Sequence, residues 1–89
     1  MKYVLFYENA GASPELIQQH AAAHQARWSE FQQAGSLVAI GPFTDGTGAM
    51  GVFTSRAAAE EFAAADPFVL HGVVRDWRVS EWLEAILNS

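Results

Sequence analysis

The sequence predicts an α+β fold in which a four-stranded antiparallel sheet carries two helices on one face. The first observation is the order of the expected segments, which is strand, helix, strand, strand, helix, strand. Right-handed crossovers place both helices of that order on the same face, which is the ferredoxin-like βαββαβ arrangement. The second observation is the length of 89 residues, which suits one domain spanning the whole chain, residues 1–89.

The first strand is expected over residues 2–8, where both alternating faces carry apolar side chains. A strand with one face in water would instead alternate with polar residues. The first helix is expected over residues 14–34. Ser13 suits its N-cap, Pro14 suits its first position, and Gly35 can adopt the left-handed conformation that ends a helix.

Apolar residues recur along this helix at spacings of three and four, which predicts one buried stripe. The stripe consists of Ile17, Ala21, His24, Trp28 and Phe31. At about 100° per residue, His24 lies near the middle of the stripe and His20 lies on its flank. The stripe therefore places an imidazole in the layer between the helix and the sheet.

Two strands joined by a hairpin are expected next, over residues 37–43 and 49–54. Between them, Asp45-Gly46 is the kind of dipeptide that closes a hairpin turn. The segment from Gly46 to Gly51 also matches G-x-G-x-x-G. A dinucleotide-binding fingerprint must open a helix, whereas this chain continues as a strand. We therefore assign these glycines to the hairpin.

The second helix is expected over residues 56–65 and the last strand over residues 73–82. Pro67 sets the end of this helix, because it disfavours the helical conformation at Asp66. Residues 81–87 are expected to form a short amphipathic tail. The side chains expected to dock it on the domain are Trp82, Ile86 and Leu87.

The sheet face opposite the helices has no cover within one chain. Yet the first three strands carry apolar side chains on both faces, and an exposed apolar surface of that size usually marks an interaction site. The simplest cover is a second copy related by a two-fold axis. The strand pattern therefore predicts a homodimer through the open sheet face.

Composition excludes several classes of function. The formal net charge is −5 and the five Lys and Arg residues are scattered, so nucleic-acid binding, which needs clustered cations, is not expected. The absence of cysteine excludes thiol catalysis and thiolate metal sites. No apolar run approaches the about 20 residues of a membrane span, and the N-terminus lacks a signal-peptide pattern. We expect a cytoplasmic protein without membrane contact.

Asp66 is placed against local electrostatics at the end of the second helix. The negative helix C-terminus disfavours a carboxylate by a few tenths to about 1 kcal/mol, so a donor or cation should lie nearby. His24 is the best candidate, because a carboxylate bound to an imidazole fixes its tautomer and supports its protonated form, as a general base requires. The alternative is structural: His24 is a satisfied half-buried helix residue, and Asp66 caps the following turn.

Other candidate residues are weaker. His20 and His24 lie four apart and could reach one metal, but no carboxylate or thiolate accompanies them in the helix. A solvated flank position for His20 is favoured, and we expect neither a metal nor an organic cofactor. His71 either lines a pocket beside Asp66 or is simply exposed. The remaining residues expected to line a substrate pocket are Tyr7, Phe43 and Phe68.

Several segments of the chain form a recognisable series. They are Tyr3-Val4-Leu5-Phe6-Tyr7, His24-Gln-Ala-Arg27-Trp28, Gly41-Pro42-Phe43, Asp45-Gly46-Thr47-Gly48 and Ala64-Ala65-Asp66-Pro67-Phe68-Val69. The His-bearing helix, the Gly-Pro strand end and the Ala-Asp-Pro-Phe segment, in that order, are fairly specific together. In these segments the chain resembles the YCII-related (YciI-like) family over nearly its whole length.

The resemblance implies a ferredoxin-like fold assembled as a dimeric α+β barrel, with an active-site His–Asp pair that corresponds to His24 and Asp66. A degradative branch of this family removes HCl from chlorinated hydroxylated aromatics with such a pair as acid and base. We therefore expect a small enzyme for proton-transfer chemistry, of lyase or isomerase type, on an unidentified small molecule. The alternative is a non-catalytic dimeric module that binds a small molecule or a protein.

Overall fold

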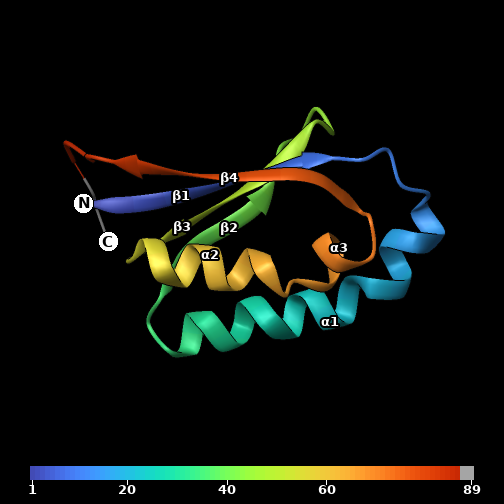
Figure 1. Ribbon diagram of the computed structural model, residues 1–89, viewed down its shortest axis with the longest axis horizontal. Coiled ribbons are helices and arrows are strands. Elements are labelled where there is room, and N and C mark those ends of the chain that lie inside the picture. Colours follow the sequence, from blue (N-terminus) through green and yellow to red (C-terminus); the bar gives the residue numbers. More distant parts are fainter. Residues whose placement is uncertain (87–89) are drawn as a thin grey trace.

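The computed structural model describes residues 1–86 and places one four-stranded sheet above a layer of helices (Figure 1). The elements are β1 (Lys2–Asn9), α1 (Pro14–Gln33), β2 (Leu37–Pro42), β3 (Gly48–Phe53), α2 (Arg56–Ala64), α3 (Pro67–Leu70) and β4 (Val74–Trp82). This order confirms the predicted α+β class. The short helix α3 was not predicted: its residues lie between the helix expected over residues 56–65 and the strand expected over residues 73–82.

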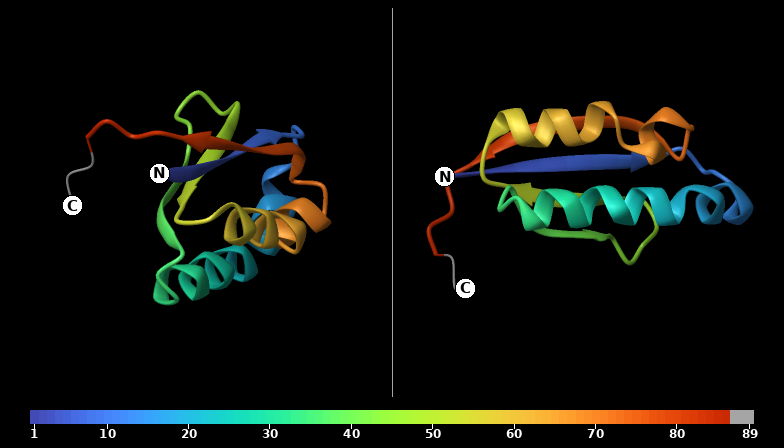
Figure 2. Two further views of the ribbon diagram at one scale, coloured as in Figure 1. Left: turned by 60° about the vertical axis from the view of Figure 1, so that its left-hand side comes forward. Right: turned by 90° about the horizontal axis from the view of Figure 1, so that it is seen from below.

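The strand order in the sheet is β2-β3-β1-β4, and every neighbouring pair is antiparallel. The first strand is therefore central, with Leu5 opposite Gly51 on one side and Val79 on the other. Helices α1 and α2 run side by side across the same face of the sheet (Figure 2). This arrangement confirms the ferredoxin-like topology, and it follows from two right-handed crossovers.

The helix ends follow the capping residues of the sequence. The Ser13 hydroxyl accepts a hydrogen bond from the Leu16 amide at 3.2 Å, and the Ser55 hydroxyl accepts one from the Ala58 amide at 3.1 Å. Gly35 follows α1 with φ of 81°, in the left-handed region that glycine tolerates. The helices end within one residue of the predicted positions.

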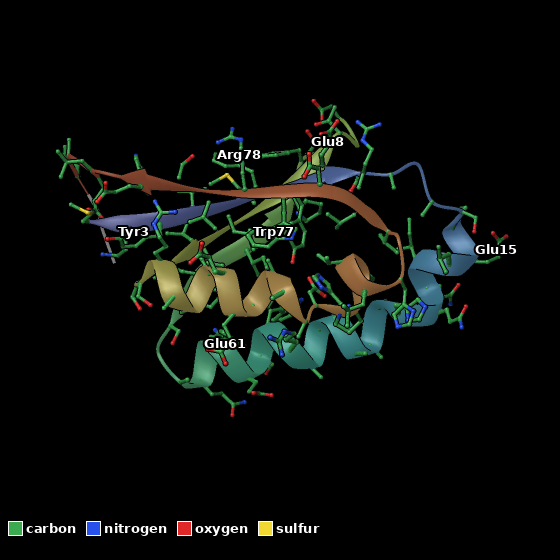
Figure 3. The ribbon with its side chains drawn as sticks, viewed as in Figure 1. Tyr3, Glu8, Glu15, Glu61, Trp77 and Arg78 are labelled. Atoms are coloured by element: carbon green, nitrogen blue, oxygen red, sulfur yellow. The ribbon has the colours of Figure 1, made fainter. Side chains whose placement is uncertain are left out.

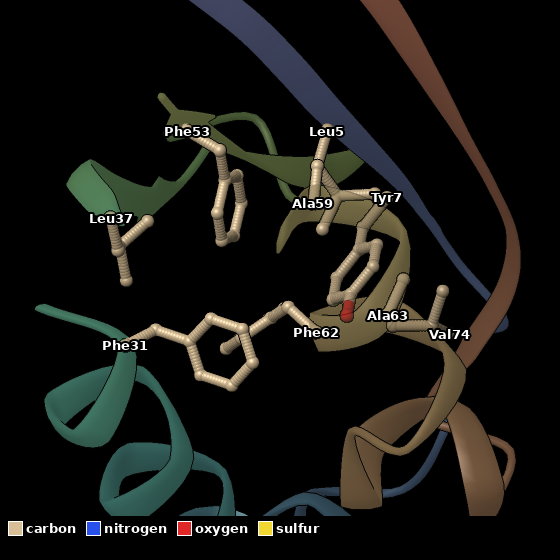
Figure 4. Close-up of a cluster of buried hydrophobic side chains, with 9 residues drawn as sticks. All are labelled: Leu5, Tyr7, Phe31, Leu37, Phe53, Ala59, Phe62, Ala63 and Val74. Carbon is tan, nitrogen blue, oxygen red and sulfur yellow. The ribbon is translucent and has the colours of Figure 1, made fainter. Parts of the chain in front are cut away.

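The core lies between the sheet and the two long helices (Figure 4). Phe53, Phe62 and Leu5 are fully buried there. The ring of Phe31 meets Phe62 and Phe53 edge to face, with centroids 5.3 and 6.3 Å apart, which is a favoured aromatic geometry. Phe31, Phe53 and Phe62 thus join α1, β3 and α2 at one end of the helical layer.

The face of the sheet away from the helices carries a second set of side chains. Trp77 points toward the helices, whereas Arg78 points to the opposite side (Figure 3). The Arg78 guanidinium lies 4.2 Å from the centroid of the Phe6 ring, within the range of a cation–π contact. Val4 and Val52 are opposite one another in the register and are already buried in the single chain.

The predicted amphipathic tail is wrong for the residues that the structure describes. Trp82 ends β4 and is 42% exposed, Ile86 is 78% exposed, and Leu87 lies outside the described residues. The segment is instead held by charge, because Glu84 pairs with the terminal amine of Met1 at 2.8 Å and with Lys2 at 3.2 Å. The first residues of the predicted tail are strand and not helix, because β4 pairs with β1 up to Trp82.

Within residues 1–86, none of the helices combines the length and apolar character that crossing a membrane demands.

Candidate active site

His24 and Asp66 meet although 42 positions separate them in the chain. His24 projects from α1, and Asp66 lies between α2 and α3. The imidazole Nδ1 is 2.8 Å from one carboxylate oxygen of Asp66 and 3.0 Å from the other. The Asp66 side chain is completely buried, whereas 16% of the His24 side chain is exposed. The pair therefore has a buried carboxylate and an imidazole that reaches solvent-accessible space.

Local sequence places Asp66 at this point. Asp66 has φ of −66° and ψ of 127°, an extended conformation of the kind that a following proline favours. Its side chain accepts a hydrogen bond from the Phe68 amide at 3.1 Å and so caps α3. The catalytic interpretation expected Asp66 to bind His24, and the structural interpretation expected Asp66 to cap the following turn. Both contacts are present.

Tyr7 is a third partner of this carboxylate. The Tyr7 hydroxyl donates a hydrogen bond to Asp66 at 2.6 Å, inside the protein. Burial of Tyr7, followed by this hydrogen bond and the negative charge of Asp66, raises the pKa of the phenol far above its ordinary value. Tyr7 therefore remains a proton donor to Asp66 throughout the physiological pH range. The sequence predicts that Tyr7 lines the pocket, but it does not predict the bond to Asp66.

Aromatic contacts hold the imidazole ring of His24 in position. The ring stacks on Phe68 of α3, with centroids 4.0 Å apart and planes 11° from parallel. Phe62 of α2 meets it edge-on at 6.3 Å. Because Nδ1 faces Asp66, Nε2 is the nitrogen left for other chemistry. Neutral His24 donates its Nδ1–H to the carboxylate, which leaves a lone pair on Nε2.

A cavity of about 640 Å³ opens beside this pair, between α1 and the strands β2 and β3. Its lining from α1 and α3 includes Ile17, Ala21, His24, Gln25, Trp28 and Phe68. Ala49 and Gly51 line it from β3. Tyr7 lines it as well, while its hydroxyl is engaged with Asp66.

The predicted buried stripe of α1 is wrong over most of its length. Of its five residues only Phe31 is buried, and Ile17 is 39% exposed. The reason is the size of the residues on the facing strand. Along β3, the helix-facing positions are Ala49, Gly51 and Phe53, so Phe53 fills the core while the two small residues leave space. The stripe therefore lines a cavity.

Two predicted pocket residues lie elsewhere. Phe43 follows β2, is 37% exposed and is not among the residues that line the cavity. His71, at the end of α3, is also exposed and outside the lining. Its ring stacks on His20 of α1, with centroids 4.0 Å apart and planes 6° from parallel. Of the two positions considered for His71 from the sequence, pocket lining or simple exposure, the structure shows exposure.

The spacing of His20 and His24 does not bring them to a common ligand position here. His20 stacks on His71, whereas His24 Nδ1 binds Asp66. Over residues 1–86 there is no group of three or more His, Cys, Asp or Glu side chains arranged to hold a metal ion. The two imidazoles of α1 therefore have separate partners, Asp66 for His24 and His71 for His20.

Arg27 is a supporting residue that sequence analysis did not single out. Its Nε donates to the Phe62 carbonyl at 3.0 Å and its Nη2 to the Glu61 carbonyl at 2.7 Å. These carbonyls belong to the last turn of α2, which has no further helical partners for them. The sequence signal that could have pointed to Arg27 is its position three residues after His24 on α1, because side chains three apart in a helix are neighbours on its surface.

Comparison with known proteins identifies the family. The YCII-related domain profile matches residues 1–83 of this chain. The chain belongs to the YCII-related family. The matched residues of this YCII-related domain contain His24, Asp66, Tyr7 and the whole cavity lining. No curated protein matches the chain in sequence.

Two solved structures show the same fold as this YCII-related chain. One is a 5-chloro-2-hydroxyhydroquinone dehydrochlorinase from Burkholderia phenoliruptrix, in complex with 2,5-dihydroxybenzoquinone, with a TM-score of 0.77 and 20% identity over 96% of each chain. The other is a hypothetical protein from Arabidopsis thaliana, with a TM-score of 0.52 and 17% identity, over 99% of this chain and 90% of that one. At these identities the likeness concerns the fold.

Proposed function

We propose that this YCII-related protein is a small enzyme that moves protons on a small molecule, with His24 as the acid/base and Asp66 as its orienting partner. The observation that carries the proposal is the two-sided placement of the imidazole. Nδ1 faces a completely buried carboxylate at 2.8 Å, and the same ring lines a cavity of about 640 Å³. A base fixed on one side and open on the other is the arrangement that general acid–base catalysis uses.

The proposed chemistry begins with neutral His24. Its Nε2 lone pair takes a proton from a C–H or O–H of the substrate, which leaves an imidazolium and a substrate anion. The Asp66 carboxylate, held by Tyr7 and the Phe68 amide, stabilises the imidazolium. The proton then returns to another substrate atom in an isomerase, or leaves with a departing group in a lyase. The chain's own side chains can perform both steps.

The comparisons support an enzymatic reading of this fold. The Burkholderia phenoliruptrix neighbour is named for the removal of chloride and hydrogen from a hydroxylated aromatic ring, which is a lyase reaction of the type proposed. In our proposal Tyr7 and Phe68 border the substrate. Phe43 and His71 have no role in it, because they do not line the cavity.

We also propose that two copies associate through the open sheet face. Phe6 and Met50 share that face by register and are only partly buried in the single chain, and β1 and β3 form its centre. An antiparallel sheet with one uncovered apolar face gains burial most simply by pairing with a copy of itself. The cytoplasmic location expected from the sequence remains a prediction.

The alternative is a non-catalytic binding module. It is favoured by the structural work of Asp66, which caps α3 and accepts from Tyr7. If the pair is purely structural, His24→Ala is expected to destabilise the fold without affecting any reaction. If it is functional, a change in stability is small compared with the loss of activity.

Hydrogen–deuterium exchange tests the proposal directly. In D₂O, we expect the protein to accelerate the exchange of acidic C–H hydrogens for deuterium in a panel of uncharged carbon acids, of which 2-indanone is the first. Proton NMR measures the exchange as the loss of the C–H signal. His24→Ala and Asp66→Asn should each slow exchange by about 10²-fold or more, because general-base contributions are of that size. Glu60→Gln changes an exposed carboxylate on α2 and serves as the control. Exchange that is equally fast in His24→Ala and the parent would refute the proposal.

A further inference from the structure

Over residues 1–86, the wall of the cavity beside His24 carries no formally charged side chain other than the imidazole itself when it is protonated. Among the described residues that line the cavity, none is Asp, Glu, Lys or Arg. Besides His24, the polar side chains of the lining are Tyr7, Asn9, Gln25 and Gln32. Of these, the Tyr7 hydroxyl donates to Asp66 and the Asn9 amide donates to the Gly46 carbonyl. The one carboxylate of the site, Asp66, is fully buried behind the imidazole.

The rest of the wall is apolar and shaped by small residues. Ala49 and Gly51 form the part contributed by β3, and a Cβ added at Gly51 would lie 3.1 Å from the Phe53 ring. Trp28 faces them from α1 as an aromatic wall, and Phe68 lies beside the imidazole. A cavity of about 640 Å³ is in the range that holds a ring-sized ligand.

We infer that the site takes an uncharged, mostly apolar ring compound with an acidic O–H or C–H, such as a phenol or an enolisable ketone, and discriminates against carboxylates and phosphates. This inference rests on the proposed function. An anion entering the cavity would lose hydration without gaining a cationic partner on the wall, and such a loss is costly. The carboxylate behind His24 adds repulsion.

An uncharged substrate avoids this cost and gains a partner only as it reacts. When His24 takes the proton, the imidazolium and the new substrate anion form at the same time and in contact. The favourable charge pair thus exists after proton transfer and not before it, which is the condition for accelerating a step and not only for binding. The charge-free wall and the single imidazole therefore act together.

A pair of probes that share one naphthalene ring, 2-naphthol and 2-naphthoate, tests the inference by titration at neutral pH. We expect naphthol to bind the parent protein about tenfold or more tightly than naphthoate, because only the carboxylate must be desolvated as an anion. The indole N–H signal of Trp28 should shift on binding. The indole signals of Trp77 and Trp82, which lie outside the lining, are internal controls for location.

A charge added to the wall provides the matched variant. Gln25 lines the cavity and Gln19 does not, and both side chains are on α1 and exposed. Gln25→Lys should raise the affinity for naphthoate by about fivefold or more by supplying the missing cation, whereas Gln19→Lys should not. Because both positions are exposed, neither variant is expected to unfold the protein.

Three results would overturn the inference. They are equal or tighter binding of naphthoate by the parent, shifts at Trp77 or Trp82 without Trp28, and no binding of either probe. The exchange experiment with His24→Ala is separate: it tests whether the imidazole acts as a base, whereas the naphthol pair tests which ligands enter. If hydrogen exchange depends on His24 but naphthol and naphthoate bind equally well, the inferred substrate class is rejected and the proposed function stands.

Discussion

Asp66 is the residue on which the candidate site and the local fold both depend. Its carboxylate is fully buried and accepts hydrogen bonds from Tyr7, from the Phe68 amide and from His24. A buried carboxylate is tolerated only when its oxygens are well provided with donors. The donors come from β1, α3 and α1, so one side chain ties the N-terminal elements β1 and α1 to the start of α3.

The hydrogen bond from Tyr7 to Asp66 predicts how stability changes with pH. We expect Tyr7→Phe to lower the free energy of unfolding by about 1–3 kcal/mol near neutral pH, because a buried Asp66 oxygen loses its donor. The pKa of Tyr7 is raised in the folded protein. Its contribution to stability is therefore fully present below the unfolded value of about 10, and declines as the pH rises above that value and the unfolded chain releases the proton.

The measurement is urea unfolding of parent and variant at several pH values from about 8 to about 11. The difference in the free energy of unfolding between parent and Tyr7→Phe should become smaller as the pH rises above about 10. Tyr3→Phe is the control, since the Tyr3 hydroxyl only approaches the Met1 sulfur at the exposed edge. A difference that stays constant to the highest pH would contradict the proposed hydrogen-bond role.

At the scale of elements, the helical layer depends on contacts between helices as well as with the sheet. Two face-to-face ring stacks join α1 to α3: His24 with Phe68, and His20 with His71. Arg27 joins α1 to the end of α2 through the Phe62 and Glu61 carbonyls. Its guanidinium also lies 5.0 Å from the Phe31 ring centroid. The cavity thus has a wall that is braced on both sides of His24.

We expect Arg27→Ala to lower the free energy of unfolding by about 1–3 kcal/mol, because two carbonyls at the end of α2 lose charged donors. Arg27→Lys should recover only part of this loss, since lysine lacks the planar fork that reaches both carbonyls. Arg75→Ala is the matched control, because Arg75 pairs with Glu8 on the exposed surface and such pairs contribute at most about 1 kcal/mol. Urea unfolding that ranks Arg27→Ala with Arg75→Ala would refute this role.

At the scale of the whole molecule, the sheet separates two different surfaces. One face is covered by helices and contains the core and the cavity. The other carries Phe6, with Arg78 over its ring, and the already buried Val4 and Val52. A second copy on this face would bury Phe6 and leave the cavity on the opposite side of the sheet.

The proposed homodimer is tested by Phe6→Lys. We expect the parent to have the mass of two chains in light scattering at about 100 µM, and the variant to have the mass of one, because a lysine beside Arg78 adds unpaired charge to the interface. Leu70→Lys is the control, since Leu70 is 61% exposed on α3 in the helical layer and its variant should remain dimeric. A parent protein with the mass of a single chain would reject the homodimer.

Signals between neighbours in the sequence determined the four strands and the helices α1 and α2, but not α3. Ser13, Gly35 and Ser55 mark helix ends, and Asp45-Gly46 marks the hairpin, because caps and turns depend on a few adjacent residues. Pro67 stops α2 at Asp66, and the helix C-terminus then demands donors for that carboxylate. The link from Asp66 to His24 could be predicted for this reason.

Only the tertiary structure decided what surrounds that pair. Strand register sets Ala49 and Gly51 beneath α1, so the stripe predicted to be buried lines a cavity. The packing of the helices on the sheet brings the Tyr7 hydroxyl of β1 to Asp66. The same packing leaves Phe43 and His71 outside the lining of the cavity. Periodicity along a helix shows which residues share a face, but the size of the residues on the opposing strand decides whether that face is packed or open.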